Sequence, residues 1–381
     1  LTLYKFELRK IISRKIVWIT GGVLLVGLVI WGIASAVLPQ NREYSDSSLN
    51  GYAANRAEQE AAEQISGRAI DQKLIDEMRP AYEDFIFNGN YKEALPYLDV
   101  YNFIGRTLGT QAGAEILVCD SEAFYEKLNA QLEANTPAGL TESISFDEPI
   151  VYHGYFDGWR QIADMMKLIT CMEIMFIAIC LSTVFTVEHT RKTDQVILCT
   201  RLGKKKLYAA KTLAGLTVGV GFTLLLSLLM FGIIAFLYGF DGYDTILQFV
   251  LLRPFNLTVG QAALILVGLS FAGAALISIF TMMLSEVTKN SIATIGIITG
   301  VLLVTMFIME MPANLKLLSE IWYLLPSNLV SLNGAFRYSM FHVGGSPLAA
   351  YQYAPIVYLV LAVIFALIGK LTYNRYQING R

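Results

Sequence analysis

Residues 16–38 read IVWITGGVLLVGLVIWGIASAVL and carry no charged side chain over 23 positions. An α-helix rises 1.5 Å per residue, so this run is long enough to cross the roughly 30 Å hydrocarbon core of a bilayer. Trp18 and Trp31 lie near its two ends, where aromatic rings favour the membrane–water interface. The stretch 34–36 imitates a signal-peptide cleavage site, but a signal peptide has an apolar core of only about 7–15 residues. We therefore expect a retained transmembrane helix.

Further apolar runs and the overall composition agree with a membrane protein. The chain has 381 residues, of which 55% are hydrophobic and only 16% charged, whereas soluble proteins carry about 25% charged residues. The sequence predicts an all-α polytopic membrane protein with six transmembrane helices. The five further helices are expected at 168–187, 212–240, 257–284, 291–309 and 351–369.

Residues 1–15, which precede the first span, combine positive charge with an apolar helical face. Tyr4, Leu8, Ile11 and Ile12 share that face at helical spacing. Such a segment suits an amphipathic elbow helix that lies in the headgroup region. An equal alternative is a charged flank of the span.

An acidic segment separates the first two spans. Residues 39–161 hold 21 Asp and Glu but only 9 Lys and Arg. We expect an inserted domain, mainly helical with a small strand content (α+β), and without a recognisable catalytic constellation. The expected elements are helices at 55–66 and 68–78, with Pro80 ending the second, a strand at 116–119, and a helix capped by Asp120 or Ser121 that runs to about Ala134.

The distribution of charge predicts the orientation in the membrane. The segments 1–15, 188–211, 285–290 and 370–381 together hold 16 basic and 4 acidic residues. The segments on the opposite side hold 13 basic and 26 acidic residues, so the positive-inside rule places both termini in the cytoplasm. The sequence thus predicts a multi-pass protein of a bacterial plasma membrane, with residues 39–161 outside the cell.

The outer loop 310–353 is longer than a simple turn. It contains IWYLLPSNLV at 321–330, an apolar stretch that is too short to cross the bilayer. This stretch either re-enters the outer half of the membrane or forms an interfacial helix anchored by Trp322 and Tyr323.

Motifs of catalysis and of metal binding are absent from the sequence. The three histidines are scattered, the four cysteines lack zinc-ligand spacing, and no G-x-S-x-G elbow occurs. Gly203-Lys204 lacks the preceding glycine and the following Ser or Thr of a phosphate-binding loop. We therefore expect no catalytic residue, no metal site and no cofactor bound by this chain, and the near-neutral net charge gives no indication of nucleic-acid binding.

Two features within the expected spans call for a physical explanation. Glu173 is the one ionisable side chain inside them, and a carboxylate in the membrane is costly, so it has either a transport-path role or a paired interfacial position. Gly215-x-x-x-Gly219 either permits close helix contact or, with Gly221 nearby, gives local flexibility.

The cytoplasmic segment 188–211 is basic and includes a short apolar stretch. Asp194 is suited to cap a helix of about two turns that Gly203 ends, with Gln195, Leu198 and Leu202 on one face. Lys204, Lys205 and Lys206 follow and are expected at the inner leaflet, where each contributes about 1 kcal/mol of attraction to anionic lipid. A loop that only sets orientation is the alternative, but it does not require a capped apolar helix.

The pattern Glu188, Val196-Ile197-Leu198, Thr200-Arg201-x-Gly203 and Ala210-Lys211 resembles the cytoplasmic loop of type-2 ABC-exporter permeases. The resemblance covers roughly 1–38 and 162–381. It implies that 194–202 is a coupling helix that docks on a separate ATP-binding-cassette ATPase, which binds ATP and Mg, and that an identical or related second permease completes a dimer. The residues to which it assigns coupling are Glu188, Asp194, Gln195, Leu198, Arg201, Leu202 and Gly203.

The insertion at 39–161 departs from minimal members of that family. In its size the insertion resembles the large outer insertions of Gram-positive permeases linked to peptide export or immunity. The resemblance therefore implies outward movement of an amphipathic or lipid-like substrate, with an antimicrobial peptide as one candidate. A membrane-anchored extracellular ligand sensor and a secondary transporter remain alternatives, although the first would need a larger cytoplasmic domain and the second more polar residues in its spans.

Overall fold

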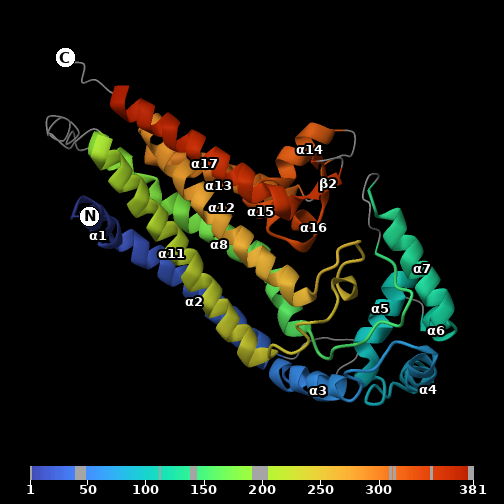
Figure 1. Ribbon diagram of the computed structural model, residues 1–381. Helices are drawn as coiled ribbons and strands as arrows, with labels where there is room; N and C mark the ends of the chain where they lie inside the picture. Colours follow the sequence, from blue (N-terminus) through green and yellow to red (C-terminus); the bar gives the residue numbers. More distant parts are fainter. Residues whose placement is uncertain are drawn as a thin grey trace.

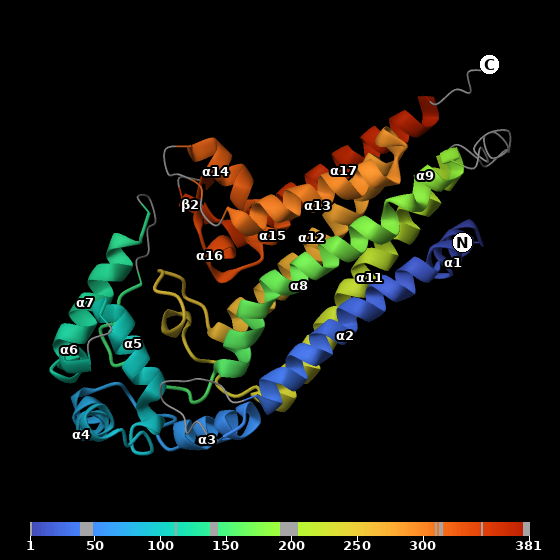
Figure 2. The same cartoon turned by 180° about the vertical axis from the view of Figure 1, so that it is seen from behind.

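Long helices form an elongated bundle, and a smaller helical domain extends from one end of it (Figures 1 and 2). Both ends of the chain lie at the opposite end of the bundle. We call these the domain end and the terminal end. The computed structural model describes residues 2–38, 49–110, 113–137, 144–190, 205–308, 311, 315–343 and 346–375.

In the described residues five helical segments are long and apolar enough to cross a membrane, which agrees with five of the six expected spans. They are α2 (Lys15–Val37), α8 (Asp157–Leu181) with α9 (Thr183–Thr190), α11 (Lys205–Leu237), α12 (Val259–Thr288) and α17 (Ala350–Arg375). The sixth expected span corresponds to α13 (Ser291–Phe307), an apolar helix of only 17 residues. Helix α8 begins eleven residues before the expected boundary of its span.

Helix α8 is the central helix of the bundle. It packs against α2, α11, α12 and α13, and 72% of its most apolar window is buried, whereas the figure is 22% for α2 and 17% for α17. The exposed apolar side chains of α2 and α17 are those expected of helices that face lipid.

The two glycines of the predicted close-contact motif lie at the crossing of α11 and α12. A Cβ at Gly215 would collide with Met282, and one at Gly219 would collide with Ser278. By contrast, nothing lies within 4 Å of the corresponding position at Gly221. Small residues at 215 and 219 therefore let the two helices approach, so the close-contact interpretation is confirmed.

The amino-terminal helix α1 (Thr2–Ile12) lies against α11 at the terminal end. Glu7 and Ile11 are buried, whereas Ile12, which the sequence places on the apolar face, is 39% exposed. A separate helix at the position of the expected elbow agrees with an amphipathic segment and not with a mere flank of α2.

The smaller domain contains α3 (Gly51–Glu63), α4 (Gln72–Asn88), η1 (Leu95–Tyr97), α5 (Leu98–Leu108), α6 (Gly113–Leu117) and α7 (Ser121–Ala134). Asp120 caps α7 by accepting a hydrogen bond from the Ala123 amide, as the sequence predicts. Two expectations are wrong. Residues 116–119 end the helix α6 and form no strand, and Pro80 lies inside α4. Burial of Leu74, Met78 and Tyr82 on both sides of the proline outweighs its helix-breaking cost of about 3 kcal/mol.

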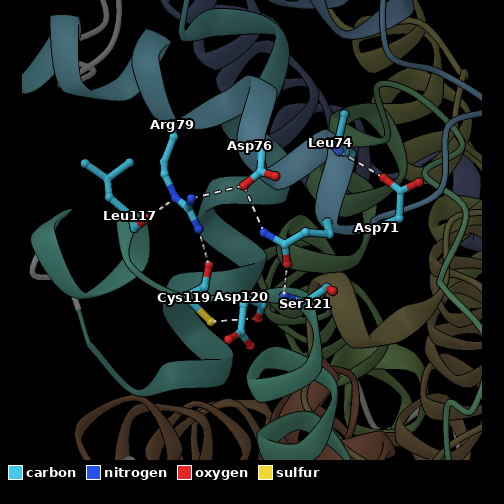
Figure 3. Close-up of polar contacts among 9 residues, drawn as sticks. Asp71, Leu74, Asp76, Arg79, Leu117, Cys119, Asp120 and Ser121 are labelled. Atoms are coloured by element: carbon cyan, nitrogen blue, oxygen red, sulfur yellow. Dashed lines mark hydrogen bonds and ion pairs between the residues drawn. The ribbon is translucent and has the colours of Figure 1, made fainter.

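One arginine joins α4 to the segment between α6 and α7 (Figure 3). The Arg79 guanidinium donates to the backbone carbonyls of Leu117 and Cys119 and lies 3.0 Å from the Asp76 carboxylate. Arg79 thus gives the carbonyls of Leu117 and Cys119 the hydrogen bonds that a neighbouring strand would provide if 116–119 formed a strand.

The domain rests on the loop between α11 and α12. Arg106 of α5 donates to the backbone carbonyls of Phe249 and Val250, and the rings of Phe103 and Phe249 stack with centroids 4.3 Å apart. The short helix η2 (Leu247–Phe249) thus carries an apolar side chain into the core of the domain.

The segment expected to be re-entrant or interfacial forms α14 (Lys316–Tyr323), α15 (Pro326–Leu329) and α16 (Leu332–Ala335). A hairpin of β1 (Tyr338–Val343) and β2 (Ser346–Ala349) then leads into α17. Helix α15 is buried against α8, α12 and α13, whereas Ile321 in α14 is 54% exposed. Helix α14 thus has an exposed apolar face and α15 enters the bundle, while the choice between a re-entrant and an interfacial position in the membrane stays a prediction.

Candidate functional site

The helix that leads from α8 toward the terminal end is interrupted at a single residue, Ser182. The carbonyl of Ser182 accepts hydrogen bonds from the hydroxyls of Thr186 at 3.1 Å and of Ser285 at 2.6 Å. Hydroxyl groups that bond to helix carbonyls are a common cause of such interruptions. Helix α9 then carries Glu188 toward α1 and α11.

The Glu188 carboxylate on α9 binds one lysine from α1 and one from α11, and we call these three side chains the basal junction. Lys10 Nζ donates to Glu188 Oε1 at 2.9 Å, and Lys211 Nζ is ion-paired with Glu188 Oε2. Glu188 and Lys211 are buried, with the Lys211 side chain 0% exposed, while Lys10 is about one third exposed. Because the two cations come from α1 and α11, the Glu188 carboxylate links three helices.

Further contacts hold α1 in this position. Arg14 donates to the Thr183 hydroxyl, and the hydroxyls of Tyr4 and Thr217 lie 2.9 Å apart. The elbow helix is therefore bonded to both helices that flank the segment 191–204.

An aromatic cluster extends the junction to the carboxyl-terminal helix. The rings of Phe185, Tyr208 and Tyr373 have centroids 5.5–5.8 Å apart in pairs, a separation at which aromatic side chains attract. The ammonium of Lys211 lies 5.0 Å from the Phe185 ring centroid, and Tyr208 donates to the Ala366 carbonyl at 3.0 Å. The junction thus contacts α1, α9, α11 and α17.

Most of the residues predicted to contact an ATPase lie in a segment that the structure does not describe. Glu188 is the exception and is the centre of the junction. Lys206 is exposed in the first turn of α11, and only the backbone of Lys205 is described. The predicted residues outside the described part of the chain are Asp194, Gln195, Leu198, Arg201, Leu202, Gly203 and Lys204.

Sequence reasoning did not identify the two cations that bind Glu188. In the sequence Lys10 is one of several cations of the segment 1–15, and Lys211 is singled out only by the resemblance. A usable signal does exist: Lys211 precedes a long apolar run and Glu188 follows one, so a helical hairpin brings opposite charges to the same membrane depth.

Glu173 lies near the middle of the bundle and is 0% exposed. Its Oε2 accepts hydrogen bonds from Thr223 on α11 and from Ser270 on α12, each at 2.9 Å. The structure therefore brings Glu173 together with hydroxyl groups of two other helices. Among the described residues no basic side chain forms an ion pair with it, so the interfacial ion pair considered above is not observed.

The outer surface of the smaller domain contains an open cavity of about 370 Å³. Its lining combines several carboxylates with aromatic and proline side chains, comprising Asp71, Ser121, Glu122, Tyr125, Glu126, Phe146, Asp147, Glu148 and Pro149. Among the described residues, no three His, Cys, Asp or Glu side chains are close enough to hold a metal ion.

Comparisons with known proteins complete this description. Residues 1–367 match the family described as ABC-2 family transporter protein. No curated protein and no solved structure matches significantly. The family match covers almost the whole chain, including the insertion that the resemblance had left out. The chain therefore belongs to the ABC-2 transporter family and is a multi-pass membrane permease of the type-2 ABC class.

Proposed function

We propose that this chain is the transport subunit of a bacterial exporter, driven by a separate ATP-binding-cassette ATPase that docks on the segment 188–211. The basal junction is the observation that supports this most directly. It lies where that segment leaves α9 and returns as α11, so a force applied to the segment acts first on the junction.

A buried ion pair is suited to transmit such a force. Breaking a buried pair by removing one partner costs about 3–5 kcal/mol, so Glu188 and Lys211 resist separation during thermal motion. Docking that differs between the ATP-bound and ATP-free states of the ATPase would then move α1, α9 and α11 together. The chain needs no nucleotide of its own, because ATP and Mg bind to the partner.

The arrangement in the membrane follows from the same proposal. The terminal end faces the cytoplasm, and residues 39–161 lie outside the cell. Helix α13 serves as the sixth span, because 17 residues extend about 25 Å, which a locally thinner bilayer accommodates. A second permease, identical or related, pairs with this one, and lipid covers the remaining apolar faces.

The proposed cargo is an amphipathic or lipid-like molecule, with a cationic antimicrobial peptide as the first candidate to test. The outer cavity supports this choice, because carboxylates beside aromatic rings complement a molecule that is both cationic and apolar.

The proposal is tested by purifying the chain with its ATPase and measuring ATPase binding and peptide-stimulated ATP hydrolysis. Replacing 194–202 with a glycine–serine linker is expected to abolish binding, and Glu188→Gln to abolish stimulation while binding persists.

Glu320→Gln is the matched control. Glu320 is also a buried carboxylate, paired with Arg337 at 2.8 Å, but it lies near the domain end. It should lower stability and leave stimulation intact. Binding and stimulation that persist in the linker variant would refute the docking assignment.

A further inference from the structure

The two carboxylate oxygens of Glu173 have different surroundings. Oε2 accepts two hydrogen bonds, from the hydroxyls of Thr223 and Ser270. Oε1 is buried and has no hydrogen-bond partner among the residues that the structure describes. One oxygen is therefore satisfied while the other is enclosed without a polar contact, which is a costly arrangement for an ionised group.

Oε1 lies where α15 enters the bundle. A Cβ at Gly273 on α12 would be 4.0 Å from Oε1 and 3.1 Å from Pro326 Cβ, so the absent side chain at 273 leaves room for both. Pro326 is the first residue of α15, whose following residues 327–329 are buried. Oε1 and Pro326 thus flank the same point beside Gly273, where α15 packs on α8 and α12.

Within the part of the chain that the structure describes, no charged side chain pairs with an ionised Glu173. Along the helices that contact α8, Lys211 on α11 is twelve residues from Thr223, or about 18 Å, and Glu286 on α12 is sixteen residues from Ser270, or about 24 Å. Helices α13 and α15 carry no titratable side chain. Other titratable groups on these helices include Lys15 on α2, Glu188 on α9, Lys167, Cys171 and Cys180 on α8, and Tyr358 on α17, whose hydroxyl donates to the Leu324 carbonyl.

An unpaired carboxylate in a dry interior costs several kcal/mol even after relaxation of the surroundings, whereas the neutral acid costs much less. The geometry suits the neutral acid, because Oε2 can accept from both hydroxyls while Oε1 carries the proton. A divalent cation would require about six oxygen ligands, and only four oxygens of three side chains meet here.

We propose that Glu173 is a proton-binding site that joins α8 to α11 and α12, beside α15, in the arrangement seen here. When α15 moves away and water reaches Oε1, the O–H bond breaks heterolytically. The proton passes to water, and the bonding electron pair stays on the carboxylate. Proton release thereby favours the rearranged state, and protonation favours the present one. This inference does not depend on how the ATPase docks.

The test uses the full-length chain in lipid nanodiscs and infrared spectroscopy of the protonated-carboxyl C=O stretch as the pH is raised. The wild type is expected to show a band that disappears with rising pH and that is lost in Glu173→Gln. Hydrogen exchange of residues 315–330, corrected for the intrinsic pH dependence of exchange, should increase over the same pH range in the wild type but not in Glu173→Gln. The Gln side chain reproduces the shape of the neutral acid and still accepts from both hydroxyls, so this variant is expected to fold.

Two further variants keep the proposal falsifiable. Thr223→Val and Ser270→Ala each remove a hydroxyl that stabilises the Glu173 carboxylate more than it stabilises the neutral acid. In each variant the pH at which half of the band has disappeared should therefore rise by about one unit. Glu320→Gln is the matched control and should leave the Glu173 band and its midpoint unchanged. A band that is absent at every pH, that persists in Glu173→Gln, or that responds to sodium and not to pH would overturn the proposal.

Discussion

Replacing Glu188 with Gln removes the carboxylate with which the buried Lys211 is ion-paired. The Lys211 ammonium, on a side chain that is 0% exposed, then loses its closest carboxylate and keeps only the weaker attraction of Glu7, so the free energy of unfolding should fall by about 3–5 kcal/mol. Loss of the contact with Lys10 adds at most about 1 kcal/mol, because Lys10 is one third exposed and keeps access to water.

Removing Lys211 in place of Glu188 should lower the free energy of unfolding by less. In Lys211→Met the apolar stem is largely retained, and Glu188 still accepts the hydrogen bond from Lys10 at 2.9 Å. We expect a loss of about 1–2 kcal/mol, and a double variant close to this value and clearly better than Glu188→Gln alone.

Equilibrium unfolding in mixed micelles with an increasing fraction of SDS measures these free energies. The decisive quantity is the coupling energy of the double-mutant cycle, expected to be about 3–5 kcal/mol because the double variant should cost about as much as Lys211→Met alone. Additive losses, or a Lys211→Met variant as unstable as Glu188→Gln, would refute the reasoning that the buried ammonium depends on Glu188.

Three further predictions concern other parts of the chain. Gly219→Ala places a methyl group against Ser278 and should cost about 1–3 kcal/mol in the same unfolding assay, whereas Gly221→Ala, with nothing within 4 Å, should not destabilise. Arg106→Ala removes the hydrogen bonds to Phe249 and Val250 and should increase hydrogen exchange in 238–258 and in α5, while Arg68→Ala, whose guanidinium bonds to Glu77 of α4, should not. Burial, with Asp157 nearby, raises the pKa of Asp99 from 3.8 to about 7 despite the hydrogen bond from Tyr152. The folded domain therefore retains a proton that the unfolded chain releases near pH 4, so stability falls as the pH rises from about 4 through 7, and Asp99→Asn should flatten this dependence in thermal unfolding at pH 5–8.

The spans could be predicted because the bilayer fixes their length and polarity. The run 16–38 corresponds to α2 at Lys15–Val37, since no tertiary contact is needed to make 23 apolar residues helical in lipid. The inserted domain lacks that constraint. Whether Pro80 ends a helix there, or whether 116–119 forms a strand, depends on which side chains its core buries, and local propensity does not contain that information.

The candidate site was predictable only in part for a similar reason. Glu188 is recognisable from its position at the end of an apolar run, but its partners lie 178 residues before it and 23 residues after it. Lys10 resembles any other cation near a membrane surface, so only the fold distinguishes it from Lys5 or Arg9. Likewise the pair Gly215 and Gly219 is compatible with flexibility or with close packing until Ser278 and Met282 are seen opposite.

The two buried carboxylates of α8 and α9 constrain how the bundle can change shape. Glu173 and Glu188 are fifteen residues apart, or about 22 Å along the helix, and both contact α11, through Thr223 and Lys211 respectively. Sliding of α8 along α11 would therefore break both contacts at once. Helix α12 is bonded at two levels as well, through Ser270 to Glu173 and through Ser285 to the Ser182 carbonyl. A displacement of the segment 188–211 should consequently move α8, α11 and α12 as one body, and α15 is the element against which that body can shift, because Glu173 Oε1 makes no hydrogen bond to it.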